Sequence, residues 1–413
     1  MTASGKENNN HKIENVLIFQ GGGSLGAFGC GVFKGFTNSR VKVDIIAGTS
    51  IGGVNAAILA GTKDDRPERA LEQFWLELAE SSTHCTPIMR WVFPYLQRRM
   101  QEGKHHHSSS STNYDTSIIN LMNEQLKHTL SFYSSAICGN SKMFLPRWRS
   151  EYAVIDLQFF RPNTWTYIYD HSPLVKTLEK YIDYNNKLQP GNNYNACLII
   201  TAVNVLTAEP LTFDSMHQQI TVKHLLGTSG YPLYGFPWIE VEKGVYAWDG
   251  SLLSNTPLRE VIDAAPIRDK RVFIVENYPR KIERLPQNMP EVYHRARDIM
   301  FSDKTAHNVR MSKVITHYLR FIDELYQLVE RHADKKEHLS EYDQKALDKI
   351  RRKYKKMTQD RGAEIKTIAH ITREEPFPYL YENTDFTPQT IRGLINEGEL
   401  KAKQILRDYR LAK

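Results

Sequence analysis

Ser50 is the residue of this sequence best suited to act as a nucleophile, because it lies between two glycines in the motif G-x-S-x-G at positions 48–52. An apolar run at 45–47 precedes the motif and small apolar residues follow it, so we expect a strand, a sharp turn and a helix. Such a turn presents the serine hydroxyl at the helix N-terminus, where the helix dipole favours a negative oxygen. Gly48 and Gly52 allow a strained backbone and a close approach of the two elements. This short motif also occurs in ordinary turns, and the strand–turn–helix context is what favours a nucleophile.

A glycine-rich loop, G-G-G-S-L-G at positions 21–26, follows another apolar run. Successive glycine amides can point together at a developing oxyanion, since no Cβ stands in the way. The same amides could hold a phosphate, but the loop lacks the G-x-x-x-x-G-K-[ST] pattern of nucleotide-binding loops. A dinucleotide fingerprint can be fitted to these glycines, with Asp44 as the acid about 20 residues further on. We favour an oxyanion loop, because Asp44 leads directly into the turn that holds Ser50.

Asp249 offers a base for the serine, in the motif D-G-x-x-x-x-N-x-P-L at positions 249–258. A buried carboxylate with a raised pKa can accept the proton of a serine hydroxyl within hydrogen-bond reach. Taken alone, Asp249 could equally cap the turn at Gly250. Together with Ser50 and the glycine loop, it is predicted to be the base.

A Ser–His–Asp triad is the alternative arrangement. The sequence has 15 histidines, and candidates for the third member, such as His294, His307 and His317, follow Asp249. The nucleophile of a triad hydrolase normally follows several strands, however, whereas Ser50 follows only the second apolar run. An oxyanion loop ahead of so early a nucleophile favours a dyad.

In this order, the three motifs resemble those of the patatin-like phospholipases. The resemblance implies an α/β fold, a three-layer sandwich with a mainly parallel central sheet, and a Ser–Asp dyad without a catalytic histidine. Ser50 would then be the nucleophile and Asp249 the base. The oxyanion hole would be formed by amides of the glycine loop, namely Gly22 and Gly23, with help from Gly21 or Ser24.

Other segments, such as 71–75, 201–205 and 381–386, resemble a long microbial subgroup with a C-terminal extension, so the resemblance covers nearly the whole chain. One departure concerns Leu25, which stands where many patatin-like enzymes have Arg or Lys. Without that cation the loop is less suited to a phosphate head group. The acyl-cleaving residues are unaffected.

Apolar runs alternate with helical stretches along the first two thirds of the chain. The clearest strands are Val16–Phe19, Val43–Ala47, Cys197–Val203 and Arg271–Val275. This alternation favours a mainly parallel sheet covered by helices. We expect a disordered N-terminal tail over residues 1–14, a catalytic domain over 15–280 with an insertion at about 86–166, and a helical C-terminal extension over 281–413. Aromatic residues at 91–95, 143–148, 159–162 and 231–237 are expected to form either an apolar wall for an acyl chain or an ordinary core of a loop-rich subdomain.

The composition is that of an ordinary globular protein, with 41% hydrophobic residues and no apolar run of 18 residues that could span a membrane. The polar N-terminus is unlike a signal peptide, and the four cysteines lack metal-binding spacing. We therefore expect a cytoplasmic protein with reduced, buried cysteines and no bound metal.

The formal net charge is +7, and much of the excess lies at 345–356, where seven Lys and Arg residues accompany one acid. This basic stretch is either a solvated helix face or a peripheral contact with an anionic membrane or lipid-granule surface. It lacks the interleaved aromatic residues of a nucleic-acid-binding surface, so no nucleic-acid partner is expected.

These observations predict a lipid acyl hydrolase that cleaves carboxylic esters of phospholipids or glycerides through an acyl-enzyme intermediate. The chemistry requires no metal or organic cofactor. The alternative is a catalytically silent lipid-surface binding or scaffold protein with the same fold; the intact Ser50, Asp249 and glycine loop argue against it. Phospholipids, lysophospholipids, neutral glycerides and polyesters are all candidate substrates, and an oligomer is compatible with the sequence.

Overall fold

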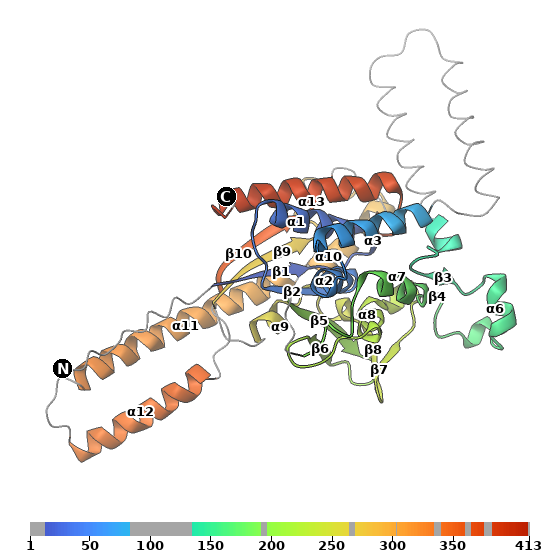
Figure 1. Ribbon diagram of the computed structural model, residues 1–413. Helices are drawn as coiled ribbons and strands as arrows, with labels where there is room; N and C mark the ends of the chain where they lie inside the picture. Colours follow the sequence, from blue (N-terminus) through green and yellow to red (C-terminus); the bar gives the residue numbers. More distant parts are fainter. Residues whose placement is uncertain are drawn as a thin grey trace, which may run out of the picture.

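The computed structural model describes residues 13–82, 134–190, 196–263, 269–302, 304–333, 340–359, 365–375 and 382–411. Residues 1–12 of the expected N-terminal tail and residues 86–133 of the expected insertion lie outside this part. Within it, helices flank a central sheet, and two long helices extend away from the body (Figure 1). The α/β class and the mainly parallel sheet that the sequence predicts are confirmed.

The central sheet of the described residues has eight strands in the order β10-β9-β1-β2-β5-β8-β7, with β6 paired to β5. The parallel strands are β1 (Glu14–Phe19), β2 (Ile45–Thr49), β5 (Cys197–Asn204), β9 (Lys270–Glu276) and β10 (Ile365–Thr372). The strands added by antiparallel pairing are β6 (Pro210–Asp214), β7 (Ile239–Glu242) and β8 (Val245–Asp249). A separate short sheet pairs β3 (Leu145–Pro146) with β4 (Tyr169–Asp170).

Helices connect these strands and cover the sheet. Those before β9 are α1 (Ala27–Asn38), α2 (Ile51–Gly61), α3 (Pro67–Ser81), α6 (Ser150–Ile155), α7 (Pro173–Tyr181), α8 (Val222–Ser229) and α9 (Leu258–Asp263). Those after β9 are α10 (Met289–Ser302), α11 (Lys304–Ala333), α12 (Glu341–Gln359) and α13 (Pro388–Asp408). In the part of the chain that the structure describes, every helix is too short or too polar to cross a bilayer.

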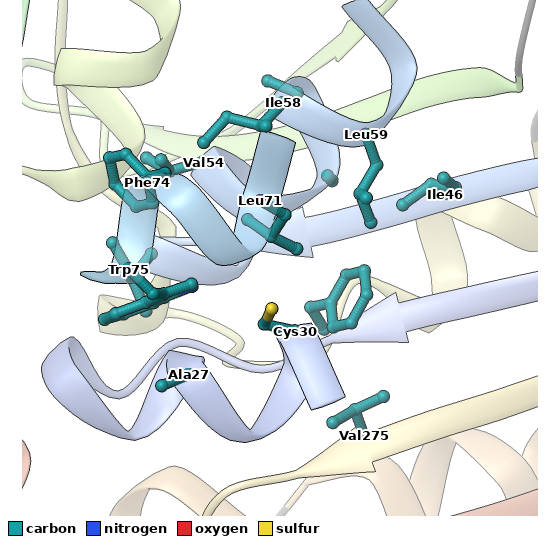
Figure 2. Close-up of a cluster of buried hydrophobic side chains, with 14 of the residues drawn as sticks. Ala27, Cys30, Ile46, Val54, Ile58, Leu59, Leu71, Phe74, Trp75 and Val275 are labelled. Atoms are coloured by element: carbon teal, nitrogen blue, oxygen red, sulfur yellow. The ribbon is translucent and has the colours of Figure 1, made fainter. Parts of the chain in front are cut away.

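Alternate residues of the parallel strands enter two different cores, as the two-residue period of a strand requires. In β1, Leu17 and Phe19 face the core under α1, α2 and α3, whereas Val16 and Ile18 face a smaller core that includes Leu258 of α9. Figure 2 shows the larger core, where side chains of α1, α2 and α3 meet those of β2 and β9. Because such strands are buried on both faces, they appear in the sequence as continuous apolar runs.

One edge of β5 is shared by two strands that meet end to end. These two strands are β2 and β8; the opposite edge of β5 is occupied by β6, which pairs with both Thr201 and Ala202. β2 runs parallel to β5 and ends with Thr49 opposite Thr201. β8 runs antiparallel and ends with Asp249 opposite Ala202. The carboxyl ends of β2 and β8 therefore face each other across a single step of β5.

The C-terminal segment is built into the same body as the strands before it. β10 joins the sheet as a neighbour of β9, and α13 lies along α1 (Figure 1). The two helix backbones approach closely: a Cβ on Gly31 would lie 1.8 Å from the Ile395 carbonyl oxygen, and a Cβ on Gly398 would lie 2.1 Å from that of Phe28. The extension expected to be helical from residue 281 thus also contributes a strand.

The cysteines only partly follow the expectation from the sequence. Cys30 and Cys197 are free and buried, and burial raises the pKa of both thiols well above the ordinary value, which makes them unreactive. Cys138 is disulfide-bonded, so the expectation that all four cysteines are reduced is wrong.

A pair of glycines in α13 provides a test of the α1–α13 contact. We expect Gly398→Ala to lower the free energy of unfolding by about 1–3 kcal/mol, because the new methyl group would collide with the Phe28 backbone. Gly393 is the matched control, since a Cβ there meets nothing within 4 Å. Gly393→Ala should raise the free energy of unfolding by about 0.5–1 kcal/mol. Urea unfolding of both variants beside the wild type measures the difference, and equal stability of the two would contradict this packing.

Candidate active site

Ser50 lies on a strained turn between β2 and α2. Its backbone has φ 58° and ψ −134°, a region that costs a non-glycine residue on the order of 1–3 kcal/mol. Gly48 and Gly52 make the turn possible: a Cβ on Gly48 would lie 2.2 Å from the Gly52 carbonyl oxygen, and a Cβ on Gly52 would lie 2.4 Å from that of Phe19. This is the strand–turn–helix arrangement that the sequence predicts around Ser50.

Three threonines hold the Ser50 turn in place. The Ser50 amide donates to Thr228 Oγ1 at 3.0 Å, and the Thr228 hydroxyl donates to the Thr201 carbonyl at 2.6 Å. Thr49 and Thr201 share a hydrogen bond between their hydroxyls at 2.7 Å. Because the Ser50 amide is bonded in this way, the strained conformation is supported by α8 and β5 together. The sequence motifs did not reveal the role of Thr228, although it lies between Gly227 and Gly230.

Asp249 lies at the end of β8, opposite the end of β2, and is only 1% exposed. Its carboxylate accepts a hydrogen bond from the Ser251 amide at 2.8 Å. Burial raises the pKa of Asp249 to about 6, while hydrogen bonds from Ser50 and Ser251 act in the opposite direction. The carboxyl group therefore interacts with the Ser50 hydroxyl and is mostly ionised at neutral pH.

The glycine loop lies directly against Ser50. A Cβ on Gly21 would lie 2.7 Å from the Ser50 Cβ, and Gly22 and Gly23 have positive φ angles of 155° and 56°. The Gly21 amide donates to Asn255 Oδ1 at 2.9 Å. In the described residues the amides of Gly22 and Gly23 have no acceptor, and both glycines line the same cavity as Ser50.

Ser24, the fourth predicted oxyanion residue, is fully buried and is not among the residues that line the cavity. Its hydroxyl donates to the Glu382 carbonyl at 3.0 Å. Of the four predicted positions, Gly22 and Gly23 thus offer unpaired amides beside Ser50, whereas Gly21 and Ser24 connect the loop to other parts of the protein.

Two asparagines anchor the loop on the other side. Asn255 Oδ1 also accepts from the Ser251 hydroxyl at 3.0 Å, and its Nδ2 donates to the Phe301 carbonyl at 3.2 Å. Asn277 Nδ2 donates to the carbonyls of Gln20 and Gly21, both at 3.1 Å. Asn255 belongs to the D-G-x-x-x-x-N-x-P-L motif, so its position was visible in the sequence, but its role was not.

Ser50, Asp249 and the glycines line one cavity of about 270 Å³, whose remaining wall is mainly apolar and aromatic. The wall predicted from 91–95, 143–148, 159–162 and 231–237 is confirmed in part, through Met143, Phe144, Tyr231, Tyr234 and Phe236. Residues 159–162 do not line the cavity, and residues 91–95 lie outside the described part of the chain. By contrast, Trp148 is 43% exposed and does not line the cavity. Residues that the sequence analysis missed come from other segments: His171, Leu174, Tyr278, Phe301, Asn383, Thr384 and Phe386.

None of the described side chains among the three histidines considered for a triad lines this cavity. His294 lies in a buried ionic cluster, and His317 is exposed on α11. The His307 side chain lies outside the described part. His171 does line the cavity and stacks on Phe236, with ring centroids 5.6 Å apart. Burial lowers its pKa to about 4, so it is neutral at physiological pH.

The buried ionic cluster contains the only described group of side chains with the composition of a metal site: His294, Asp298, Glu375 and Glu382. Arg297 and Arg373 already donate to Glu382 Oε1, at 2.9 and 2.8 Å. Burial disfavours the charge of His294, but hydrogen bonds to Asp298, Glu375 and Glu382 outweigh it and raise its pKa to about 10. With three cationic side chains facing three carboxylates, the cluster is neutralised internally and does not favour a further cation.

The family model described as "Patatin-like phospholipase" matches residues 17–262, more than half of the chain. The chain belongs to the patatin-like phospholipase family. This assignment implies a lipid acyl hydrolase, and patatin-like phospholipases are typically serine hydrolases. The predicted resemblance is thereby confirmed.

Two solved structures are similar to this chain at low identity. The crystal structure of VipD from Legionella pneumophila matches over 96% of this chain and 67% of that chain, with 13% identity and a TM-score of 0.38. The structure of SpcU with ExoU from Pseudomonas aeruginosa matches over 68% of this chain and 47% of that chain, with 15% identity and a TM-score of 0.26. No curated protein matches significantly. At these scores neither structure bears on the chemistry of the site.

The burial of Asp249 predicts a pH-dependent cost to stability. The pKa of Asp249 is about 6 in the folded protein and 3.8 ordinarily, so the buried negative charge lowers the free energy of unfolding above pH 6. This destabilisation shrinks as the pH falls from 6 and is absent below 3.8, where the carboxyl group is protonated in both the folded and the unfolded state. Asp249→Asn should therefore raise the free energy of unfolding by about 3 kcal/mol at pH 8 and by about half as much at pH 5. Urea unfolding at the two pH values measures this. Ser50→Ala, which keeps the carboxylate, is the control, and an equal effect of Asp249→Asn at both pH values would contradict the raised pKa.

Proposed function

We propose that this patatin-like phospholipase cleaves carboxylic esters of lipids with a dyad of Ser50 and Asp249. The observation that supports it most directly is the end-to-end meeting of β2 and β8, which brings the strained Ser50 and the buried Asp249 to one point of an apolar cavity. The unpaired amides of Gly22 and Gly23 lie at the same point. Nucleophile, base and oxyanion donors are the three groups that acyl transfer requires.

In the proposed reaction, the Asp249 carboxylate accepts the proton of the Ser50 hydroxyl while Oγ attacks the ester carbonyl carbon. The amides of Gly22 and Gly23 stabilise the oxyanion of the tetrahedral intermediate. Its collapse breaks the ester bond, and Asp249 returns the proton to the leaving alkoxide, which leaves an acyl group on Ser50. A water molecule then gives a proton to Asp249 and attacks the acyl carbon. The bond to Ser50 Oγ breaks, Asp249 returns the proton to that oxygen, and the fatty acid departs.

The lining of the cavity supports a lipid acyl chain as the group that it holds. Its wall is aromatic and aliphatic, and none of its described lining residues is Lys or Arg. Leu25, at the position where many patatin-like enzymes carry a cation, is 2% exposed and packs in the core. A phosphate head group would therefore find no cationic partner inside the cavity, and we propose that the acyl chain rather than the head group determines binding.

Peripheral contact with an anionic lipid surface is proposed for the α11–α12 hairpin. This hairpin extends from the body (Figure 1). On α12, Lys349, Arg352 and Lys353 are exposed, and on α11 Tyr318 and Phe321 are 62% and 55% exposed. Basic side chains near an anionic surface contribute about 1 kcal/mol each. A catalytically silent lipid-binding protein would use the same surface, so activity at Ser50 is what separates the two functions.

Active-site labelling tests the nucleophile. We expect a fluorophosphonate probe to form one adduct with the wild type, mapped to Ser50 by peptide mass spectrometry. Ser50→Ala should form none and should lose esterase activity by about 1,000-fold or more, since it removes the oxygen that forms the acyl-enzyme. Circular dichroism of the variant controls for folding. Full esterase activity in Ser50→Ala, or an adduct elsewhere, would refute the assignment.

The pH dependence of hydrolysis tests the base. Only the ionised Asp249 can accept the serine proton, so kcat/KM for a neutral ester should rise with pH and level off above its pKa of about 6. Asp249→Asn should lower kcat/KM strongly and remove this rise. A rise centred clearly above pH 7 that persists in Asp249→Asn would indicate a different base, such as a histidine.

A further inference from the structure

The glycine loop is in direct contact with a short segment near the C-terminus. A Cβ on Gly23 would lie 2.2 Å from the Asn383 carbonyl oxygen, so only glycine fits at this point of the loop. The Ser24 hydroxyl donates to the Glu382 carbonyl at 3.0 Å, across a sequence separation of 358 residues. The contacting segment is the 3₁₀ turn Glu382–Thr384, which we call the C-terminal turn.

The C-terminal turn is itself fixed by the buried ionic cluster. Glu382 is 2% exposed, and its Oε1 accepts from Arg297 Nη2 at 2.9 Å and from Arg373 Nη2 at 2.8 Å. Arg297 also donates through Nη1 to Asn383 Oδ1 at 3.2 Å. Arg373 donates through Nε to the Asn277 carbonyl at 2.9 Å, and Asn277 holds the other side of the glycine loop. The two arginines come from α10 and from the segment after β10.

These contacts connect the glycine loop to the buried ionic cluster on the side of the loop that faces away from the cavity. Neither Glu382 nor the two arginines line the cavity that contains Ser50. The Ser24 hydroxyl is likewise buried outside it. None of these groups can therefore touch an acyl chain bound in that cavity. Ser24 and Glu382 reach the proposed chemistry through the backbone of the glycine loop, whereas Arg297 also contacts Asn383 and Tyr278 of the cavity wall.

A purely stabilising role accounts less well for this arrangement. Burying an arginine and a carboxylate costs desolvation that about cancels their attraction, so an apolar contact would stabilise the fold equally well. What charged hydrogen bonds add is a fixed geometry, because the guanidinium group binds in defined directions. Oxyanion donors need such a geometry, since they act only when held at hydrogen-bond distance from the developing charge.

We propose that Ser24, Glu382 and Arg297 are positioning residues for the oxyanion-hole loop, and that they place the amides of Gly22 and Gly23 through the C-terminal turn. This inference rests on the proposed function, since it concerns the same loop and the same reaction. It makes the C-terminal segment part of the catalytic apparatus and not an appended module.

Ser24→Ala is the most selective test, because it removes the hydroxyl bond to Glu382 and leaves the Ser24 amide in place. We expect kcat for a short-chain ester to fall about 10- to 100-fold, the size of effect that a small misplacement of catalytic groups produces. KM should stay within about twofold of the wild type, since the acyl wall is unchanged. A loss of stability alone would also lower the apparent kcat at unchanged KM, because it lowers the concentration of active enzyme. Active sites are therefore counted by fluorophosphonate titration carried to completion, and kcat is expressed per labelled site.

Ser82→Ala is the matched control. Its hydroxyl lies within hydrogen-bond distance of two carbonyls, that of Ala79 at 2.7 Å and that of Phe386 at 3.0 Å, so it reaches the same C-terminal segment without contact to the glycine loop. The Ser82→Ala variant should keep the wild-type kcat.

Arg297→Lys is the second test variant. Lysine keeps the positive charge but lacks the guanidinium fork that bonds Glu382 and Asn383 together, so this variant should show the same fall in kcat as Ser24→Ala.

The outcomes separate this inference from the proposed function. If the wild type is not labelled at Ser50, the proposed function fails. If the wild type is labelled and active while Ser24→Ala and Arg297→Lys keep the wild-type kcat, the positioning role is refuted and the proposed dyad stands. An equal fall in Ser82→Ala, or a rise in KM with unchanged kcat, would also refute it. If Ser24→Ala does not fold, the kcat of Arg297→Lys is the measurement that supports or refutes the positioning role.

Discussion

The meeting of β2 and β8 on one edge of β5 is the constraint on which the site depends. Each strand ends where the other prevents it from continuing, so both chains must turn out of the sheet at the same place. Gly250, the residue after Asp249, lies so close to this junction that a Cβ would be 2.7 Å from the Thr201 carbonyl oxygen. The glycines at 48, 52 and 250 follow from this convergence of backbones. This convergence brings the side chains of Ser50 and Asp249 within hydrogen-bond distance in one cavity.

Two features that oppose folding are concentrated at this junction. Ser50 has a backbone conformation that a non-glycine residue avoids, and Asp249 carries a charge that burial disfavours. Both are held by neutral hydrogen bonds from rigid elements, through Thr228 of α8 and the amide of Ser251. A nearby cation would have stabilised the Asp249 carboxylate but would also have lowered its pKa and weakened it as a base. The absence of Lys and Arg from the described cavity lining therefore suits both an apolar substrate and a carboxylate base.

The sequence predicts the parts of this site that depend on local chain geometry. The glycines around Ser50, the loop at 21–26 and Asp249 form short motifs with a direct physical meaning, and the buried parallel strands appear as apolar runs. Thr228, Asn277 and His171 could not be predicted in the same way, because each acts through a partner distant in the sequence. β10 was also missed: its run IKTIAHIT alternates polar and apolar residues as an edge strand does, within a segment that otherwise reads as helical. The choice between Gly21 and its neighbours as oxyanion donors required knowing that Asn255 bonds the Gly21 amide.

The match to the family model ends at residue 262, but the described structure does not end there as a folding unit. β1, which leads into the glycine loop, pairs on one side with β2 and on the other with β9, at 270–276. Without β9, the strand that carries the loop would be an unpaired edge, open to pairing with another chain. Tyr278 and Phe301, which stack 5.1 Å apart, and the C-terminal turn then close the cavity from the same side. Because parallel pairing of this kind brings together distant parts of the chain, the site is completed only when residues up to 386 have joined the fold. The segment after the family match therefore belongs to the same folded body as the motifs that identify the family.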